Sequence, residues 1–278
     1  MFKNFWLNRF RVFRFFRRQL LKKASCYKSN FIEIEGRKMY LDKDDSLKLS
    51  LFPYAVEVTE IMKREIKKGD TVVDMGANIG YFTCLFAQLV GETGKVFAFE
   101  PETKNFEILK KNVEANGYKN VTIEQKAVAD KTQKITMYLS NSPKDHRIYS
   151  YDQNRDSIEI DGITLDDYFK NYDKKIDFIK SNIQGADCGA IQGMRNIIKK
   201  SKPELKIITE FTPSMLKGFG TDPGECLDLL LEEGFKFFDV RLYEKKAIPI
   251  SKDELLERYP SNSKKGGDIF CTLQKNSN

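Results

Sequence analysis

Short apolar stretches alternate with amphipathic stretches along most of the chain. The apolar stretches have the length of buried strands, whereas the stretches between them repeat apolar residues with the helical period. The predicted strands are Thr71–Asp74, Lys95–Phe99, Val121–Lys126, Ile176–Lys180, Leu205–Phe211, Phe235–Val240 and Asp268–Leu273. The predicted helices are Leu51–Lys68, Ile79–Val90, Glu102–Asn116, Thr164–Phe169, Ala186–Lys200 and Pro223–Glu233.

This alternation predicts an α/β fold with a doubly wound, mostly parallel seven-stranded sheet covered on both faces. No clear helix separates the last two predicted strands, so the last strand should run antiparallel. Ile135–Leu139 either extends the sheet or forms a hairpin. The polar stretch Asn141–Asp161 is predicted to be a loop, either at an active site or as an exposed connection.

Charge divides the chain into a basic segment and a nearly neutral body. The net charge is +7, but residues 1–30 contain nine Lys or Arg and no Asp or Glu, which leaves −2 on the remainder. We predict a basic, aromatic segment over residues 1–30, a short β lead-in over 31–50, and one α/β domain over 51–278. Within the lead-in, Phe31–Leu41 alternates as a strand does. A body without net basic charge does not favour nucleic acid as a partner.

Aromatic and basic residues are interleaved through the first residues of the chain. No apolar run there approaches the roughly 20 residues needed to span a bilayer, and recurring arginines interrupt any signal-like apolar stretch. Residues 1–28 are therefore an interfacial helix on anionic lipid, a helix packed on the body or a second subunit, or a tail. The composition favours a cytoplasmic protein, and peripheral contact with the inner face of the membrane is a hypothesis.

Histidine and cysteine content excludes several kinds of site. The one histidine, His146, rules out a His-rich metal centre. It lies in the polar stretch and is predicted to be an exposed loop residue rather than a catalytic one. The five cysteines are far apart and form no CxxC pair, so we expect reduced thiols and neither a zinc site nor a disulfide framework.

The segment from Thr71 to Thr83 combines a strand, a tight turn and the start of a helix. Its turn has the pattern D-x-G-x-N-x-G, in which Asp74 ends the strand and Gly76 allows close approach to a ligand. A dinucleotide site has G-x-G-x-x-G and places a pyrophosphate at the helix N-terminus, where the Asp74 carboxylate would repel it. The acid suits a cofactor with an ammonium and a sulfonium group, such as S-adenosylmethionine (SAM). The alternative is that Asp74 only caps the helix.

Two further strand ends supply candidate residues. Glu100-Pro101 follows the second predicted strand, where an acidic residue accepts hydrogen bonds from ribose hydroxyls. A surface Glu before a helix-starting Pro is the alternative. Ala127-Val-Ala-Asp130 follows the third strand, where Asp130 or a backbone amide would contact the adenine edge unless Asp130 is only a turn residue.

Seven segments match one family pattern in order: VVDMGANIGYFT, FAFEPETKNFEILKKNVEANG, IEQKAVAD, GITLDDYF, DFIKSNIQGAD, AIQGM and KIITEFTP. In these segments the chain resembles the FkbM-type family of SAM-dependent methyltransferases over most of residues 51–273. The resemblance implies a Rossmann-like class I methyltransferase domain over residues 51–278. It also implies methyl transfer from SAM, often to a hydroxyl of a sugar or a secondary metabolite. The expected cofactor-binding residues are Asp74, Gly76, Ala77, Asn78, Gly80, Glu100, Pro101, Ala127 and Asp130.

The chain departs from the family pattern at two places. The pattern K-x-D-x-(E/Q)-G-A-E is altered, because Asn182 replaces its Asp and Asp187 replaces its final Glu. Tyr54-Ala55 stands where the family often has Tyr-Glu. Asn182 and Ala55 each remove a carboxylate, so a divalent-metal mechanism is not expected.

The candidate catalytic residues, Lys180, Asn182 and Glu210, lie at the ends of the fourth and fifth predicted strands. Glu210 is the preferred general base for a hydroxyl acceptor, and its alternative role is as a buried partner of Lys180. Lys180 would hold an acceptor oxygen, or act as a base if its pKa were lowered. Asn182 is suited to orienting a hydroxyl.

Other functions remain open beside a small-molecule or glycan acceptor. Nucleic acid or protein acceptors belong to the same enzyme class, but the near-neutral body and the lack of an Asp-Pro-Pro-Tyr tetrapeptide disfavour nucleic acid. A SAM-binding scaffold without catalysis is suggested by Ala55 and Asn182. A nicotinamide dehydrogenase is disfavoured by the D-x-G-A-N-x-G turn.

Overall fold

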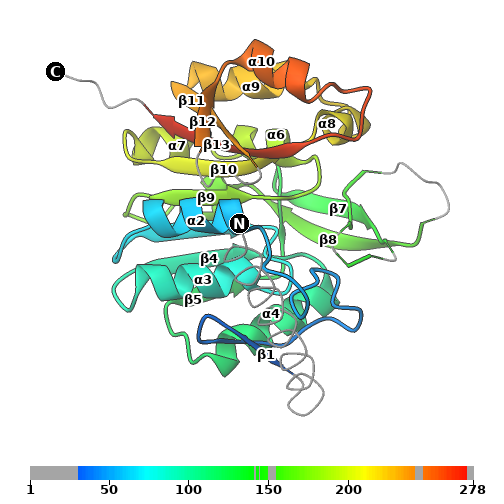
Figure 1. Cartoon of the computed structure of the whole chain (residues 1–278). Helices are drawn as coiled ribbons and strands as arrows, with labels where there is room; N and C mark the ends of the chain where they lie inside the picture. Colours follow the sequence, from blue (N-terminus) through cyan, green and yellow to red (C-terminus); the bar gives the residue numbers. More distant parts are fainter. Residues whose placement is uncertain (1–30, 141, 144, 150–154, 242–246, 274–278) are drawn as a thin grey trace, which may run out of the picture.

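The computed structural model describes residues 31–140, 142–143, 145–149, 155–241 and 247–273. A large sheet crosses the molecule in the strand order β12-β11-β13-β10-β9-β3-β4-β5 (Figure 1). Its strands are β3 (Thr71–Met75), β4 (Lys95–Phe99), β5 (Val121–Glu124), β9 (Phe178–Ser181), β10 (Lys206–Phe211), β11 (Phe235–Val240), β12 (Ala247–Ile250) and β13 (Gly267–Leu273). The α/β prediction is confirmed.

Most neighbouring strands of the sheet are parallel, and β13 runs antiparallel to both of its neighbours, β10 and β11, as predicted. The predicted number of seven strands is wrong, because β12 adds an eighth strand antiparallel to β11. A short helix, α10 (Lys252–Arg258), then leads toward β13. Ser251 and Glu254 form a capping box at its start, which is a helix signal present in the local sequence.

Helices cover both faces of the sheet and enclose two apolar cores. One core contains α2 (Val56–Glu65), α3 (Tyr81–Val90) and α4 (Thr103–Ala115). The other contains α5 (Leu165–Tyr168), α6 (Asp187–Gln192), α7 (Arg195–Ser201), α8 (Pro213–Phe219) and α9 (Pro223–Glu232) together with α10. Successive residues of β3 point into opposite cores, Val72 into the first and Val73 into the second, so this central strand is apolar on both sides.

The predicted helix over residues 186–200 is two helices, α6 and α7, separated near Gly193. At this break the backbone of Gly193 lies against the chain at Ala129: a Cβ atom on Gly193 would lie 2.3 Å from the Ala129 carbonyl oxygen. Helix α8 was not predicted. It begins at Pro213, a residue favoured in the first turn of a helix.

Two small sheets complete the described fold. The lead-in forms a hairpin, β1 (Ile32–Ile34) with β2 (Arg37–Met39), whose following residue Tyr40 exchanges backbone hydrogen bonds with the Asn112 side chain of α4. The second sheet has the order β6 (Ala127–Val128), β8 (Ser157–Ile163), β7 (Gln133–Tyr138). The hairpin alternative for residues 135–139 is therefore the one observed, and the end of the predicted loop 141–161 is strand β8.

The chain reverses direction across the sheet beside β3. It builds β4 and β5 on one side of β3 and then crosses to β9 on the other side. Loops diverge at such a point and leave a crevice at the carboxyl ends of the strands. Residues 1–30 lie outside the described residues, so the proposed membrane contact of residues 1–28 stays a prediction. Among the described helices, none has the length and apolar character to cross a membrane.

Candidate functional site

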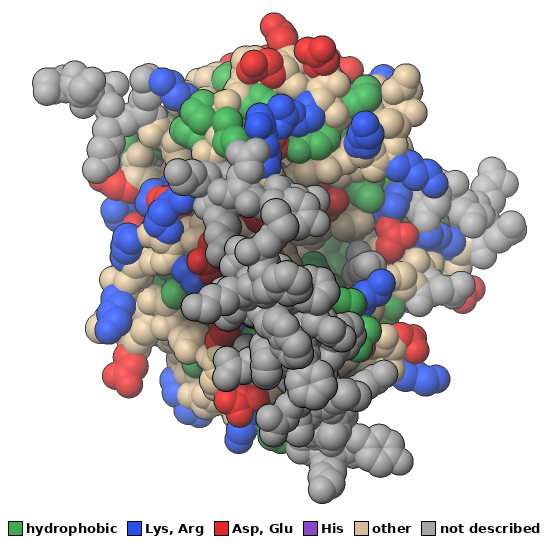
Figure 2. Space-filling view, in the orientation of Figure 1, with side chains coloured by type: hydrophobic (Ala, Val, Ile, Leu, Met, Phe, Trp, Pro, Cys, Tyr) green, Lys and Arg blue, Asp and Glu red, His purple; other side chains and the backbone are tan. Residues whose placement is uncertain are grey.

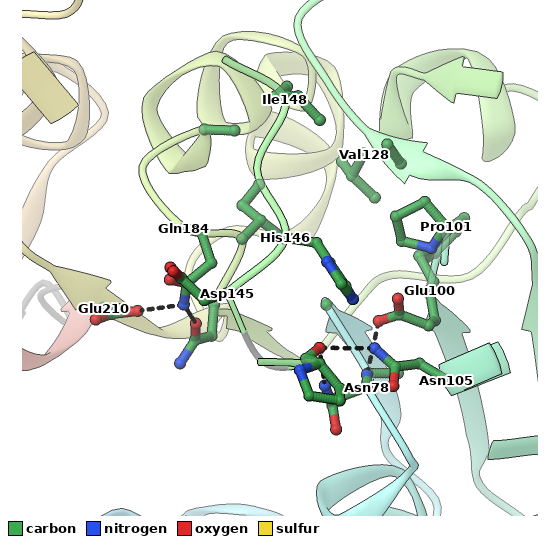
Figure 3. A pocket seen from close by; sticks show the side chains of 18 of the residues that line it. Asn78, Glu100, Pro101, Asn105, Val128, Asp145, His146, Ile148, Gln184 and Glu210 are labelled. Carbon is green, nitrogen blue, oxygen red and sulfur yellow. Dashed lines mark hydrogen bonds between the residues drawn. The ribbon is translucent and has the colours of Figure 1, made fainter. Parts of the chain in front are cut away.

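A cavity of about 550 Å³ lies at the carboxyl ends of the central strands (Figure 3). Its volume falls within the roughly 300–1,000 Å³ of small-molecule sites. The predicted site residues at its wall are Gly76, Ala77, Asn78, Glu100, Pro101, Ala127, Lys180, Asn182 and Glu210. Three predicted residues, Asp74, Gly80 and Asp130, are not among the lining residues.

Asp74 lies beneath the cavity and not at its surface. Its side chain is fully buried, and one carboxylate oxygen lies 3.0 Å from the Lys180 ammonium while the other accepts a hydrogen bond from the Thr83 hydroxyl at 2.7 Å. Lys180 also donates to the Gly76 carbonyl at 2.8 Å and to the Met75 carbonyl at 3.3 Å. The acid therefore holds Lys180, and Lys180 holds the turn that forms the cavity floor.

Gly76 and Gly80 serve different packing needs. Gly76 has φ +73°, and a Cβ atom there would lie 2.2 Å from the Asn182 carbonyl oxygen, so glycine lets the ends of β3 and β9 meet beneath the cavity. A Cβ atom on Gly80 would lie 2.6 Å from the Leu109 side chain, so this glycine lets α3 pack on α4. Gly80 does not line the cavity, and its predicted role at the ligand stays a prediction.

Glu100 is buried at the end of β4 and lines the cavity. One of its oxygens accepts the Asn78 backbone N–H at 2.8 Å, and the other accepts the Glu102 backbone N–H at 3.0 Å. Burial raises the pKa of Glu100 to about 7, although these two hydrogen bonds favour the charged form. Each oxygen keeps a second lone pair, so the carboxylate can still accept hydroxyl donors from a ligand.

The side chain of Gln184 joins Glu210 to Asn182. The Gln184 amide donates to the Asn182 side-chain oxygen at 2.9 Å and to Glu210 at 3.3 Å, and the Thr212 hydroxyl donates to Glu210 at 3.1 Å. Burial, followed by the nearby acids Asp187 and Asp268, raises the pKa of Glu210 to about 7. Glu210 is therefore not the direct partner of Lys180, whose ion pair is with Asp74.

Two further acids lie close to Glu210. Asp268 of β13 is the cross-strand neighbour of Glu210, and burial raises its pKa to about 6. It lines a side pocket of about 50 Å³ that shares Tyr54, Lys180 and Asn182 with the main cavity. Asp187, at the start of α6, is buried and accepts hydrogen bonds from the Ser181 and Thr209 hydroxyls. Sequence reasoning missed Asp268, because only pairing of β13 with β10 brings it here.

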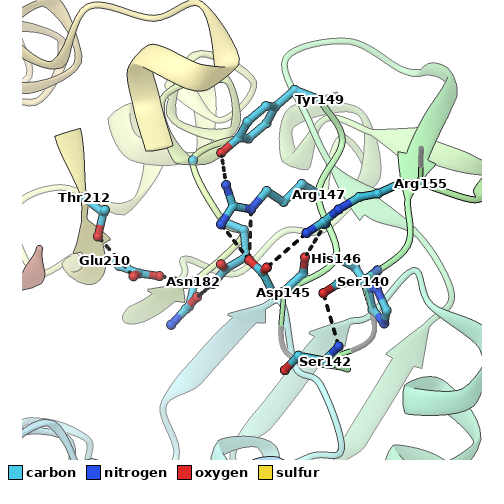
Figure 4. Close-up of polar contacts among 12 residues, drawn as sticks. Ser140, Ser142, Asp145, His146, Arg147, Tyr149, Arg155, Asn182, Glu210 and Thr212 are labelled. Carbon is cyan, nitrogen blue, oxygen red and sulfur yellow. Dashed lines mark hydrogen bonds and ion pairs between the residues drawn. The ribbon is translucent and has the colours of Figure 1, made fainter. Parts of the chain in front are cut away.

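The described residues between Ser140 and Tyr149 (140, 142–143 and 145–149), called the loop wall, close the other side of the cavity through Pro143, Asp145, His146 and Ile148. Asp145 accepts two hydrogen bonds from Arg147 and forms an ion pair with Arg155 at 3.5 Å (Figure 4). Arg147 also donates to the Tyr149 hydroxyl at 2.8 Å, and the Tyr149 ring packs on Phe219 of α8. These contacts tie the loop wall to the body.

His146 is half-buried in the cavity wall, so its prediction as an exposed loop residue is wrong. Its Nδ1 atom accepts the Ser140 backbone N–H at 3.0 Å. Burial lowers the pKa of the imidazole. The sequence around His146 contains no signal for this arrangement. It depends on contacts of the loop with Asn78, in the turn after β3, and with Asn105 of α4.

Ala127 lines the cavity as predicted, whereas Asp130 is exposed beside Gly189 of α6. The adenine contact predicted for Asp130 therefore stays a prediction, for a residue that does not line the cavity. Within the described part of the chain, no group of three or more His, Cys, Asp or Glu side chains has an arrangement that could hold a metal ion.

Comparisons with known proteins agree with this geometry. Residues 74–237 match the methyltransferase FkbM domain. A protein-L-isoaspartate O-methyltransferase of Methanococcus maripaludis is 35% identical over 97 residues, which are 34% of this chain and 42% of that protein. Another from Methanococcoides burtonii is 36% identical over 59 residues, 21% of this chain and 29% of that protein. The chain thus spans less than half the length of these curated relatives.

Solved structures of two methyltransferases also match the chain, at low TM-scores. The FkbM methyltransferase from Methylobacillus flagellatus KT has a TM-score of 0.44 and 17% identity, covering 74% of this chain and 43% of that chain. The SAM-dependent O-methyltransferase from Thermotoga maritima has a TM-score of 0.44 and 16% identity, covering 89% of this chain and 79% of that chain.

The sheet order, with its antiparallel β13, and the crevice beside β3 define a Rossmann-like class I methyltransferase fold. The family match covers more than half of the chain and includes the turn after β3 and the strand bearing Glu210. The chain therefore belongs to the FkbM methyltransferase family, and its cofactor is SAM.

Proposed function

We propose that this protein transfers a methyl group from SAM to a hydroxyl of a neutral, sugar-like acceptor, with Glu210 as the general base. The observation that supports this best is a half-buried carboxylate at the cavity wall, beside Asp187 and Asp268, whose pKa is raised to about 7. A base whose pKa lies near the working pH combines a useful fraction of the charged form with a good driving force for proton transfer.

The residues of the cavity fit SAM. Glu100 offers a buried carboxylate for ribose hydroxyls, and Pro101, Ala127, Val128 and Met137 offer an apolar wall for the adenine. The turn at Gly76 leaves room that a side chain would fill. Asp74 acts on the cofactor only through Lys180, because it lies beneath the wall. We propose no cofactor contact for Gly80 or Asp130.

The reaction is an in-line displacement in which the residues mainly align the reacting atoms. Bound SAM supplies a methyl group already activated on a sulfonium. Asn182 and Gln184 orient the acceptor hydroxyl, and Glu210 takes its proton while the oxygen–methyl bond forms and the carbon–sulfur bond breaks. The products are a methyl ether and S-adenosylhomocysteine (SAH), and Glu210 releases the proton to water.

The electrostatics around Glu210 favour a neutral acceptor. Glu210 and Asp268 lie at this end of the cavity, and the Lys180 ammonium is already paired with Asp74 and two backbone carbonyls. The other lysine of the described wall, Lys126, lies 3.6 Å from Glu124. A phosphate or carboxylate on the acceptor would meet acids rather than unpaired lysines here.

The charges of the described residues on the face in Figure 2 give no support to a nucleic acid acceptor. On the face in Figure 2, acidic and basic side chains of the described residues are interspersed rather than gathered by sign. We therefore keep a small-molecule or glycan acceptor as the proposal, and we propose residues 51–278 as the methyltransferase unit with residues 31–50 packed on α4.

The proposal is tested by calorimetry with SAH followed by a turnover assay on a panel of neutral glycosides and sugar phosphates. Glu210→Gln should leave the SAH dissociation constant unchanged and slow turnover by roughly 10²–10⁴-fold, as for loss of a general base. The matched control is Glu257→Gln, since Glu257 is exposed on α10. Turnover that survives Glu210→Gln removes this base, and preference for sugar phosphates removes the neutral acceptor.

A SAM-binding scaffold without catalysis is the second candidate, because Asn182 and Ala55 lack the carboxylates of the family pattern. Tight SAH binding with no turnover on any acceptor of the panel would favour it.

A further inference from the structure

Two asparagines from different parts of the fold donate to one carbonyl of the loop wall. The Asn105 side chain of α4 donates to the Pro143 carbonyl oxygen at 2.9 Å, and the Asn78 side chain donates to the same oxygen at 3.2 Å (Figure 3). Asn105 is only 2% exposed, so its amide is reserved for this contact rather than for water. A carbonyl held by two donors fixes the position of the loop wall above Glu100.

The loop wall then turns His146 toward the cavity. The Ser140 backbone N–H donates to Nδ1, and the Ser142 backbone N–H donates to the Ser140 hydroxyl. An imidazole that accepts at Nδ1 carries its proton on Nε2 when it is neutral. Nε2 is thus a hydrogen-bond donor, and no described residue accepts from it.

The surroundings of this donor define its ligand. In Figure 3 the His146 ring extends toward Glu100 and Pro101, on the side of the cavity opposite Gln184 and Glu210. Glu100 is the proposed ribose acceptor, and Pro101, Val128 and Ile148 are the apolar neighbours. A nucleoside fits this part, because it has a flat apolar face and ring nitrogens and hydroxyl oxygens that accept hydrogen bonds.

We infer that His146 binds the adenosine half of the cofactor through Nε2–H, and that Asn78 and Asn105 are positioning residues that hold it there through the Pro143 carbonyl. The inference rests on the proposed function, since it takes SAM as the ligand. It also gives a role to the asparagine of each motif. Asn78, within the glycine turn, and Asn105, after Glu100-Pro101, each contribute one donor to the same loop carbonyl.

The test uses the fact that the chain has one histidine. In the full protein with ¹⁵N-labelled histidine and a His-free affinity tag, the imidazole gives one pair of nitrogen signals. Saturating SAH should shift the Nε2 signal and leave Nδ1 unprotonated. 5′-Methylthioadenosine, which contains the adenosine half, should cause the same shift, whereas homocysteine should not.

Binding affinities provide the second measurement. His146→Ala should raise the SAH dissociation constant about 3- to 10-fold, the value of one hydrogen bond. Asn105→Ala should raise it similarly. The control is Asn116→Ala, because Asn116, at the opposite end of α4, also donates to a backbone carbonyl, that of Lys38, but lies away from the cavity. Its affinity for SAH should stay within 2-fold of wild type, roughly the resolution of the assay.

The outcomes separate this inference from the proposed function. If calorimetry shows that wild type binds SAH while the imidazole signals stay unchanged at saturation, the role of His146 is overturned and the methyltransferase proposal stands. Wild-type affinity in His146→Ala has the same consequence. If wild type binds no SAH at all, the proposed function and this inference fail together.

Discussion

The pair of Asp74 and Lys180 gives the sharpest prediction, because both partners are buried at adjacent positions of β3 and β9. The Asp74 side chain is 0% and the Lys180 side chain 8% exposed, and their charged atoms lie 3.0 Å apart. Asp74→Asn retains the shape and one acceptor for the Thr83 hydroxyl but removes the negative charge beside Lys180. The ammonium is then left with the Met75 and Gly76 carbonyls alone.

Leaving one charge of a buried pair without its partner costs about 3–5 kcal/mol of unfolding free energy. Desolvation of the pair is nearly complete, so no reduction for solvent screening applies. For a domain of this size the loss corresponds to a fall in melting temperature of roughly 6–20 °C. The SAH affinity should fall as well, because Lys180 then holds the Gly76 turn less firmly.

Urea denaturation and SAH calorimetry on four variants test the reasoning. Asp74→Asn and Lys180→Met should each lose the full amount, whereas the double variant Asp74→Leu with Lys180→Met should lose much less, since no buried charge remains. Thr83→Val, which removes only the hydroxyl donor to Asp74, should lose about 1–3 kcal/mol. A loss below about 1 kcal/mol for Asp74→Asn would show that the pair is open to water and refute the argument.

Three further predictions concern the cavity. Because the pKa of Glu210 is raised to about 7, kcat/KM should rise through that pH. The protonated form is the one favoured in the fold, so its contribution to stability is complete below the usual glutamate pKa and is lost as pH rises through about 7. Glu210→Gln should abolish the rise in pH-rate profiles but only reduce the pH dependence of stability in melts, because the raised pKa values of Glu100 and Asp268 remain. Gly76→Ala should lower SAH affinity more than tenfold and unfolding free energy by well over about 1 kcal/mol, because its Cβ would meet the Asn182 carbonyl at 2.2 Å. The control Gly117→Ala has φ +69° and open space around its Cβ, so it should lose only about 1 kcal/mol of unfolding free energy. Equal losses in the two variants would contradict the steric argument. Glu100→Gln should weaken SAH binding roughly 10- to 100-fold in calorimetry, because one or two charge-assisted hydrogen bonds to the ribose are lost. Unchanged affinity would show that Glu100 does not bind the cofactor.

Local patterns determined most of the elements and the floor of the cavity. The alternation of buried strands and amphipathic helices sufficed for an α/β fold with an antiparallel β13, and the turn from Asp74 to Gly80 located the crevice. These features depend on residues close together in the chain, where periodicity and glycine conformations act directly. The additional strand β12 and the helix break at Gly193 were missed, because packing against distant segments decides them.

What each site residue does was decided by contacts between distant segments. Asp74 looked like a cofactor ligand, but β9 places the Lys180 ammonium beside it and buries both. Asp268 reaches Glu210 only through pairing of β13 with β10, and His146 reaches the cavity only through the asparagines that hold the loop wall. The sequence by itself determined most of the elements and where the crevice opens, because periodicity and turn residues act locally. A charge or a hydrogen bond acts over a few ångströms in space, whatever the separation in sequence. The tertiary structure alone decided which side chains meet in the crevice.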